Sequence, residues 1–196
     1  MLLAISTSTE ALSVALFDGD RLVASFHEII GRGHAERLLP AIAEVMGNRR
    51  AGEIAVDCGP GSFTGVRVGI AAARGLGIAW RAPVRGFSSL PLMAAAVEAA
   101  GPFAIANRAG HGEVFLEMFT CSPLRSLRPA RSVPPEEAAR LCGDAPVKGT
   151  GAQLVWPGSA GLAYPDARRL RALPPTFVDL PPRPLYLRAP DAKLPA

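Results

Sequence analysis

An Asp-Gly turn between two strand-like segments is the sequence feature that most narrows the folds open to this chain. Asp18-Gly19-Asp20 follows the apolar run 12–17 and precedes residues 21–28, which are expected to return as a strand. Asp-Gly in this setting is a strong hairpin signal, because glycine accepts the positive φ of a tight turn. With residues 2–5 as an earlier strand, the chain is expected to open on three strands that include an antiparallel hairpin.

Helical periodicity begins after Gly31. Across residues 34–46 apolar side chains recur at helical spacing, and Gly47 suits the end of a helix. A strand at 53–56, a glycine turn, a helix at about 64–80 and a strand at 83–87 are expected next. The alanine-rich residues 90–100 predict a third helix, which ends at Gly101-Pro102.

After Pro102 a similar order of strands and helices is expected to begin again. Strands are expected at 103–106 and 113–120 around a turn at 109–112, and helices at 136–141 and 166–173. Residues 181–196 hold five of the 19 prolines, which predicts an extended tail. The repeated order predicts an α/β fold of two ribonuclease-H-like lobes in tandem, the architecture of the actin and sugar-kinase superfamily. The expected divisions are a first lobe at 1–101, a second lobe at 102–180 and the tail at 181–196.

The amino-acid composition limits the classes of protein to which the chain can belong. At 196 residues, 49% hydrophobic and 19% charged, the chain is long enough for one domain or two small lobes with a buried core. The net charge of +4 is carried almost entirely by scattered arginines, which leaves open either a GC-rich genome or a weak attraction to RNA. Three distant cysteines, a start without a signal-peptide pattern and no long apolar run predict a cytoplasmic protein with no membrane partner.

The glycine turn at 58–65 fits neither of two common phosphate-binding signatures. The P-loop lysine is missing, and the spacing of Gly59, Gly61 and Gly65 does not match the dinucleotide fingerprint. Gly59 and Gly61 are expected to take φ values closed to other residues, and Ser62 or Thr64 to cap the following helix. Both a structural turn and incidental anion binding at the helix start remain open.

The helix after this turn carries a ridge of small residues at every fourth position: Gly65, Gly69, Ala73 and Gly77. Each interior glycine costs roughly 0.5–1 kcal/mol relative to alanine, and close approach of another backbone is the usual compensation. That backbone could belong to the chain's own sheet or to a partner protein.

At GPGSFTGVRVGIA the chain closely resembles the bacterial TsaB (YeaZ) family. The resemblance also covers ISTSTEALSVAL, GHAERLLPAI, PVRGFSSL, NRAGHGEVFLEMF and PLYLRAPDAKLP, and the middle of the second lobe, 122–175, looks shortened. The resemblance implies an inactive relative of TsaD, the subunit that transfers threonylcarbamoyl to an adenosine beside the tRNA anticodon.

The same resemblance implies partners and an interface. A TsaD-like catalytic subunit would bind the two helices of the first lobe, and a TsaE-like ATPase would join the complex. The chain would contact tRNA only indirectly, through these partners. A homodimer through the same helices is also implied. By position in the matched stretches, the interface would contain His34, Arg37, Leu38, Ile42, Val66, Gly69, Ile70 and Ala73.

Acidic residues are missing where the superfamily holds magnesium and nucleotide. The resemblance places Ser6 and Arg108, with Asn107 beside it, where relatives carry aspartate. The three histidines are far apart, and Asp57, beside the glycine turn, is expected to act in capping or to face solvent. The leading hypothesis is therefore a non-catalytic scaffold with no catalytic residue, metal or cofactor. The alternatives are a small ATP-dependent phosphotransferase or ATPase, and a direct RNA-binding module.

Overall fold

The computed structural model describes residues 1–121, 123–159 and 163–187 of the chain. Its first sheet has five strands in the order β3-β2-β1-β4-β5. Strands β1 (Leu2–Ser6), β2 (Ala11–Asp18) and β3 (Arg21–Ile29) form an antiparallel meander, whose hairpin turns at Gly19 with φ 59°. Strands β4 (Glu53–Asp57) and β5 (Val84–Phe87) continue the sheet in parallel with β1. The predicted hairpin is confirmed.

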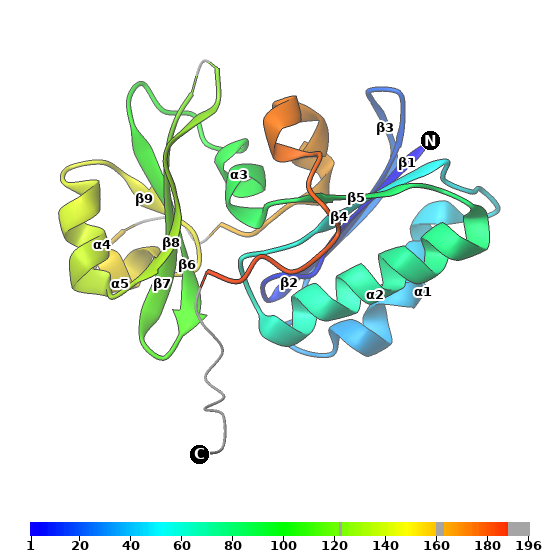
Figure 1. Ribbon diagram of the computed structural model, residues 1–196, viewed down its shortest axis with the longest axis horizontal. Helices are drawn as coiled ribbons and strands as arrows, with labels where there is room; N and C mark the ends of the chain where they lie inside the picture. Colours follow the sequence, from blue (N-terminus) through cyan, green and yellow to red (C-terminus); the bar gives the residue numbers. More distant parts are fainter. Residues whose placement is uncertain (122, 160–162, 188–196) are drawn as a thin grey trace.

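Helices cover both faces of this sheet, which explains why β1 is apolar throughout instead of alternating. Helices α1 (His34–Met46) and α2 (Phe63–Trp80) lie side by side on one face, over a core that includes Leu3, Ile5 and Val56 (Figure 1). On the other face, Leu2 and Ala4 belong to a core that includes residues from much later in the chain.

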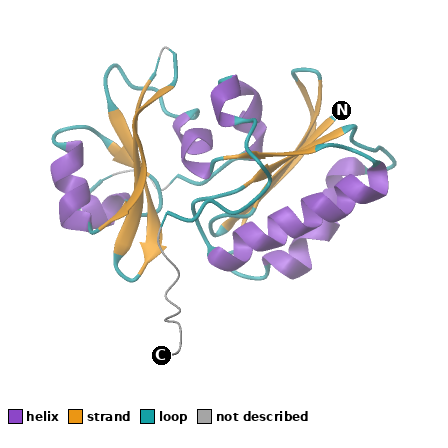
Figure 2. Cartoon of the chain, viewed as in Figure 1, coloured by secondary structure: helices purple, strands orange, loops and turns teal. Residues whose placement is uncertain are grey.

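The second sheet has four strands in the order β8-β7-β6-β9. It contains β6 (Phe103–Gly110), β7 (Glu113–Thr120), β8 (Arg125–Val133) and the short β9 (Val147–Lys148). Helices α4 (Pro135–Cys142) and α5 (Ala152–Val155) cover its outer face, and α3 (Ser89–Ala94) lies between the two sheets (Figure 2). The predicted fold class, two α/β lobes in tandem, is confirmed.

Several elements differ from the sequence predictions. Helix α3 ends at Ala94 and not near residue 100, because the alanines that follow give a helix little apolar surface to bury. Strand β8 was not predicted, since RSLRPARSV has no strand-like pattern and is held by pairing with β7. The helix expected at 166–173 is a 3-10 helix, η1 (Ala167–Ala172), and a second one, η2 (Pro175–Phe177), follows.

From residue 166 the chain returns to the first sheet. Ala167 N donates to Ser13 Oγ at 2.9 Å, Leu180 forms a bridge with Gly86, and Leu185 N donates to Cys58 O at 2.8 Å. Residues 167–180, which the sequence assigned to the second lobe, therefore border the first. Of the expected tail, 188–196 lie outside the described residues. No helix in the described parts of the chain has the length and apolarity needed to cross a membrane.

Candidate functional site

The glycine turn is fixed by the loop that follows β1. Gly59 has φ 89°, and a Cβ at Gly61 would overlap the carbonyl oxygen of Ser8. Ser62 N donates to that same oxygen at 2.6 Å, and Ser62 Oγ accepts from Gly65 N at 3.2 Å to cap α2. Gly61 is thus required for close approach and not for a positive φ. Ser62, one of the two predicted caps, is the residue that caps the helix.

Asp57 holds the turn and the loop together. It is fully buried, and its Oδ2 accepts from Ser6 Oγ and Ser8 Oγ, both at 2.6 Å, while Oδ1 accepts from Gly59 N at 2.8 Å. Burial raises the pKa of the Asp57 carboxyl, and the three hydrogen bonds oppose that rise without cancelling it. Asp57 therefore has neither of the two roles expected from sequence: Ser62 caps the helix, and the Asp57 carboxyl group is shielded from solvent and joins two loops.

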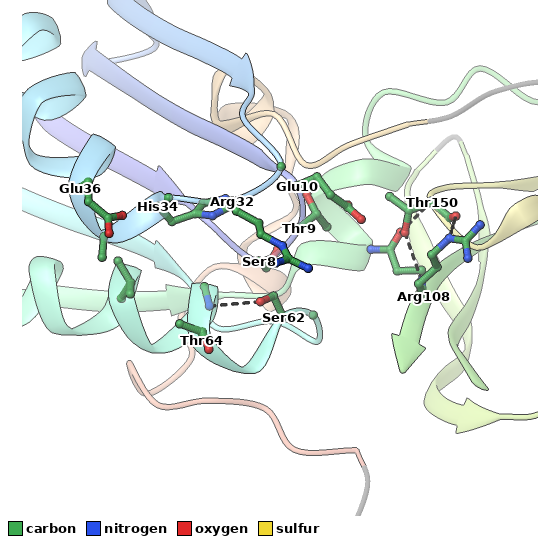
Figure 3. Close-up of a pocket in the computed structure, with 17 residues that line it drawn as sticks. Ser8, Thr9, Glu10, Arg32, His34, Glu36, Ser62, Thr64, Arg108 and Thr150 are labelled. Atoms are coloured by element: carbon green, nitrogen blue, oxygen red, sulfur yellow. Dashed lines mark hydrogen bonds between the residues drawn. The ribbon is translucent and has the colours of Figure 1, made fainter. Parts of the chain in front are cut away.

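A cleft of about 520 Å³ lies between the lobes (Figure 3). The first lobe contributes the loop after β1, the loop before α1 and the start of α2. The second lobe contributes the end of β6 and Thr150. Polar and charged side chains dominate its lining: Ser8, Thr9, Glu10, Arg32, His34, Glu36, Ser62, Thr64, Asn107, Arg108 and Thr150.

Hydrogen bonds within the second lobe hold its side of the cleft in place. Buried Asn107 accepts through Oδ1 from Thr150 N at 3.2 Å, and Arg108 Nε donates to Thr150 O at 3.1 Å. These contacts fix the two residues that stand where the resemblance places an aspartate. Among the described residues, no three His, Cys, Asp or Glu side chains come together in a way that could hold a metal ion.

The histidines lie apart in space as well as in sequence. His34 is buried at the start of α1, with Nε2 3.3 Å from Ala11 O. His27 in β3 has a buried Nδ1 without a hydrogen-bond partner in the described structure, and His111 occupies the turn between β6 and β7 with φ 50°. They do not form one site.

The structure buries most of the interface residues that the resemblance implies. Seven of the eight are buried inside the chain, and Arg37, which forms ion pairs with Glu28 and Glu44, is half-buried. The small-residue ridge of α2 faces the chain's own sheet, since a Cβ at Gly65 would overlap Thr7 O. Close packing within the monomer therefore explains the ridge. The seven buried residues are His34, Leu38, Ile42, Val66, Gly69, Ile70 and Ala73.

The opposite sides of the same helices expose apolar side chains. Leu39 on α1 is 56% exposed, and Phe63 and Ile78 on α2 are 61% and 82% exposed. A hollow of about 350 Å³ between the C-terminal parts of the helices is lined by residues that include Leu76 and Trp80. We call the exposed sides of the two helices, taken together, the outer face; the hollow lies on the α1 side of α2, and Phe63 and Ile78 lie on the other side of α2. On α2 it follows one helical stripe, made of Phe63, Arg67, Ala71, Arg74 and Ile78.

The final described segment contributes to the outer face. Arg67 stacks over the Phe63 ring, 3.5 Å from its centroid, and its Nη2 donates to Tyr186 OH at 2.8 Å. Arg74 Nη2 donates to Pro182 O at 2.7 Å. Sequence reasoning missed this stripe because it followed the glycine ridge. The signal available was the helical spacing of Phe63, Arg67 and Ile78 away from that ridge.

Comparisons with known proteins agree with this architecture. The family model of TsaD, tRNA N6-adenosine threonylcarbamoyltransferase, matches residues 26–119. The Haemophilus influenzae tRNA threonylcarbamoyladenosine biosynthesis protein TsaB is 46% identical over 101 residues, which are 48% of this chain and 42% of that protein. The Escherichia coli protein of the same name is 41% identical over 98 residues, 47% and 42% of the two chains. The chain thus matches less than half the length of these two relatives.

A solved structure matches nearly the whole chain. YeaZ from Pseudomonas aeruginosa superposes with a TM-score of 0.79 and 30% identity, covering 95% of this chain and 99% of that one. Its similarity includes both lobes, whereas the two sequence matches above cover only about half of the chain.

Proposed function

This chain belongs to the TsaB (YeaZ) family, and on that premise we propose that it is a non-catalytic subunit in threonylcarbamoyladenosine modification of tRNA. Its role is to bind and support a TsaD-like catalytic subunit, which a TsaE-like ATPase joins. The relatives' names support the pathway. The scaffold role and the partners are our proposal.

The observation that carries the proposal is the outer face of α1 and α2. Three large apolar side chains are more than half exposed there: Leu39, Phe63 and Ile78. Aromatic and arginine side chains are enriched in protein interfaces, and Phe63 and Arg67 supply both. Because the inner faces of the helices are buried in the core, a partner would meet these outer residues and not the seven buried ones.

The non-catalytic part of the proposal is supported by how the cleft residues are used. Ser6 donates to buried Asp57, and Asn107 and Arg108 bind Thr150. These side chains hold the walls of the cleft in place. The carboxylates in the lining are those of Glu10 and Glu36, both from the first lobe, so the second lobe brings no acid to the lining.

Association with the cognate TsaD-like subunit tests the proposal. The full chain mixed with that subunit should elute as a complex from a sizing column. Ile78→Asp and Leu39→Asp should each weaken the complex at least about tenfold, because they place a charge in a desolvated interface. Leu22→Asp, at another exposed leucine (43%) on β3, is the matched control and should bind as the parent chain does. Full binding by both outer-face variants would reject this surface.

A homodimer through the same face makes a related prediction. If two copies associate through α1 and α2, the catalytic subunit should compete with the second copy. Light scattering of the chain alone should then show a dimer that Ile78→Asp also dissociates. A dimer that forms together with the mixed complex would place the two contacts on different surfaces.

The alternative function, an ATP-dependent phosphotransferase, would place its ligand in the cleft between the lobes. Its volume and the presence of Arg32, Arg108 and Ser62 in the lining suit an anionic ligand. Calorimetry of the isolated chain with ATP and magnesium separates the two hypotheses. Tight binding that is lost in Arg32→Ala would favour the alternative, and the absence of heat of binding would favour the scaffold.

A further inference from the structure

Strand β8 carries three exposed arginines that we call the arginine strip: Arg125, Arg128 and Arg131. Within the described parts of the chain none of them has an ion-pair partner, unlike Arg37, which is paired. The strand sequence RSLRPARSV contains no acidic residue. The strip is therefore a local excess of positive charge.

The position of β8 limits what it could bind. It is an edge strand of the second sheet, a position that is open to strand addition. Pro129 has no N–H to donate, and charged side chains along an edge oppose strand pairing. Strand addition is thus disfavoured, and the side chains of β8 are the groups left to make contacts.

An apolar hollow of about 250 Å³ adjoins the strip. Arg128 and Arg131 line it together with Glu117, which is only 6% exposed. Apolar side chains complete the lining: Leu116, Met118, Leu127, Pro129 and Leu141. Charged side chains alone would be enough to protect an edge strand from pairing. The apolar hollow between the arginines is a second feature, and the two features together indicate a ligand that carries both negative charge and flat apolar parts.

The length of the strip adds a second requirement. Arg125 and Arg131 pair with Thr120 and Leu116 of β7, which are four residues apart, so the strip spans roughly 13 Å along the bulged strand. A ligand with several anionic groups can meet each arginine where it lies, whereas a single carboxylate or phosphate would have to draw the two side chains together. A nucleic-acid strand meets both requirements, because its phosphates repeat along the chain and its unstacked bases offer apolar faces.

We infer that the arginine strip and the adjoining hollow bind a single-stranded segment of RNA. Phosphates lie on the three arginines, and an unstacked base covers the hollow. The choice of RNA rests on the proposed function, and the inference goes beyond it by giving this chain a direct contact with the substrate. The strip lies on the second lobe and the outer face on the first, so RNA and a protein partner could bind together (Figure 1).

Fluorescence anisotropy with an unmodified tRNA transcript and a short unstructured RNA tests the inference. The triple variant Arg125→Ala, Arg128→Ala, Arg131→Ala should bind both RNAs at least about tenfold more weakly at about 50 mM salt. Its slope of log K against log salt should be shallower by roughly 2 to 3, one phosphate contact per arginine. The triple variant Arg50→Ala, Arg169→Ala, Arg183→Ala removes equal charge from exposed positions elsewhere and is the control.

Further variants distinguish the contribution of charge from that of side-chain shape, and distinguish RNA binding from the proposed function. Arginine-to-lysine substitution at all three positions keeps the charge and should retain most of the binding, which also covers the case in which the alanine variant fails to fold. Leu127→Asp should weaken RNA binding but leave association with the TsaD-like subunit intact, and Ile78→Asp should do the reverse. The two claims can therefore fail independently.

Three results would overturn the inference. The strip and control triple variants could lose RNA affinity equally. An RNA duplex could bind as tightly as the unstructured RNA. A polyglutamate peptide could displace the RNA from the strip at equal concentration, which would point to an acidic protein as the ligand.

Discussion

The buried carboxyl groups of Asp57 and Glu117 differ in their hydrogen-bond partners. Asp57 receives three hydrogen bonds that join the loop after β1 to the glycine turn. Glu117 lies on β7, where burial raises its pKa to about 7 and a hydrogen bond with Ser126 opposes the rise. Asp57 organises the wall of the cleft, whereas Glu117 lies in the hollow beside β8, with Arg128 and Arg131 in the same lining.

Glu117 should make the stability of the protein depend on pH. Its pKa is raised from 4.5 to about 7, so the folded state favours the protonated form. The stabilisation is complete below pH 4.5 and is lost as the pH rises through 7. Relative to Glu117→Gln, the free energy of unfolding of the parent chain should fall by roughly 3 kcal/mol between about pH 4.5 and pH 8.

Urea denaturation at several pH values measures this difference. Glu136→Gln, at an exposed position on α4, is the control and should follow the parent chain. If the difference between the parent chain and Glu117→Gln did not change with pH, the assignment of the raised pKa would be wrong.

At the scale of elements, α2 has two faces with separate uses. Its inner glycines bring the helix backbone against the first sheet, where Thr7 Oγ1 donates to Gly65 O at 2.7 Å. Its outer stripe exposes Phe63, Arg67 and Ile78. One helix thus combines close packing inside the chain with a surface available to a partner.

A pair of glycine substitutions on α2 tests this division. Gly65→Ala should destabilise the fold by about 1–3 kcal/mol or more, because the new Cβ overlaps Thr7 O in the core. Gly75→Ala should instead stabilise it by up to about 1 kcal/mol, because no atom lies within 4 Å of its Cβ and alanine favours a helix. Chemical denaturation measures both. Equal effects at the two positions would show that the inner face is not tightly packed.

Local signals made much of the first lobe predictable. The Asp-Gly hairpin, the periodicity of α1 and the Ser62 cap each depend on a few neighbouring residues. Strand β8 depends on pairing with β7, and the burial of Asp57 depends on the loop after β1, so neither could be read from its own segment. For the same reason sequence could detect the glycine ridge but could not decide what it packs against.

At the scale of the whole molecule, the first lobe is built from both ends of the chain. Ala167, Leu170 and Leu173 complete the core on the face of the sheet that includes Phe17. Leu180 bridges the edge strand β5. The first sheet therefore packs against residues 167–180 as well as against residues of the first 101.

Truncation should expose this dependence. A chain that ends at residue 164 should melt well below the parent chain and be cleaved faster within β1 and β2 by protease, because it leaves Phe17 and Phe87 uncovered. A chain that ends at Leu187 retains all these contacts and is the control. If the shorter chain melted with the parent chain, η1 would contribute little to the first lobe.

The stack of Phe63, Arg67 and Tyr186 joins residues more than a hundred positions apart on one surface. During translation, α2 leaves the ribosome long before Tyr186 has been added. A binding partner that contacts all three side chains would therefore not recognise nascent chains or chains that stop before Tyr186. Such a partner would bind only those copies whose synthesis has passed that tyrosine.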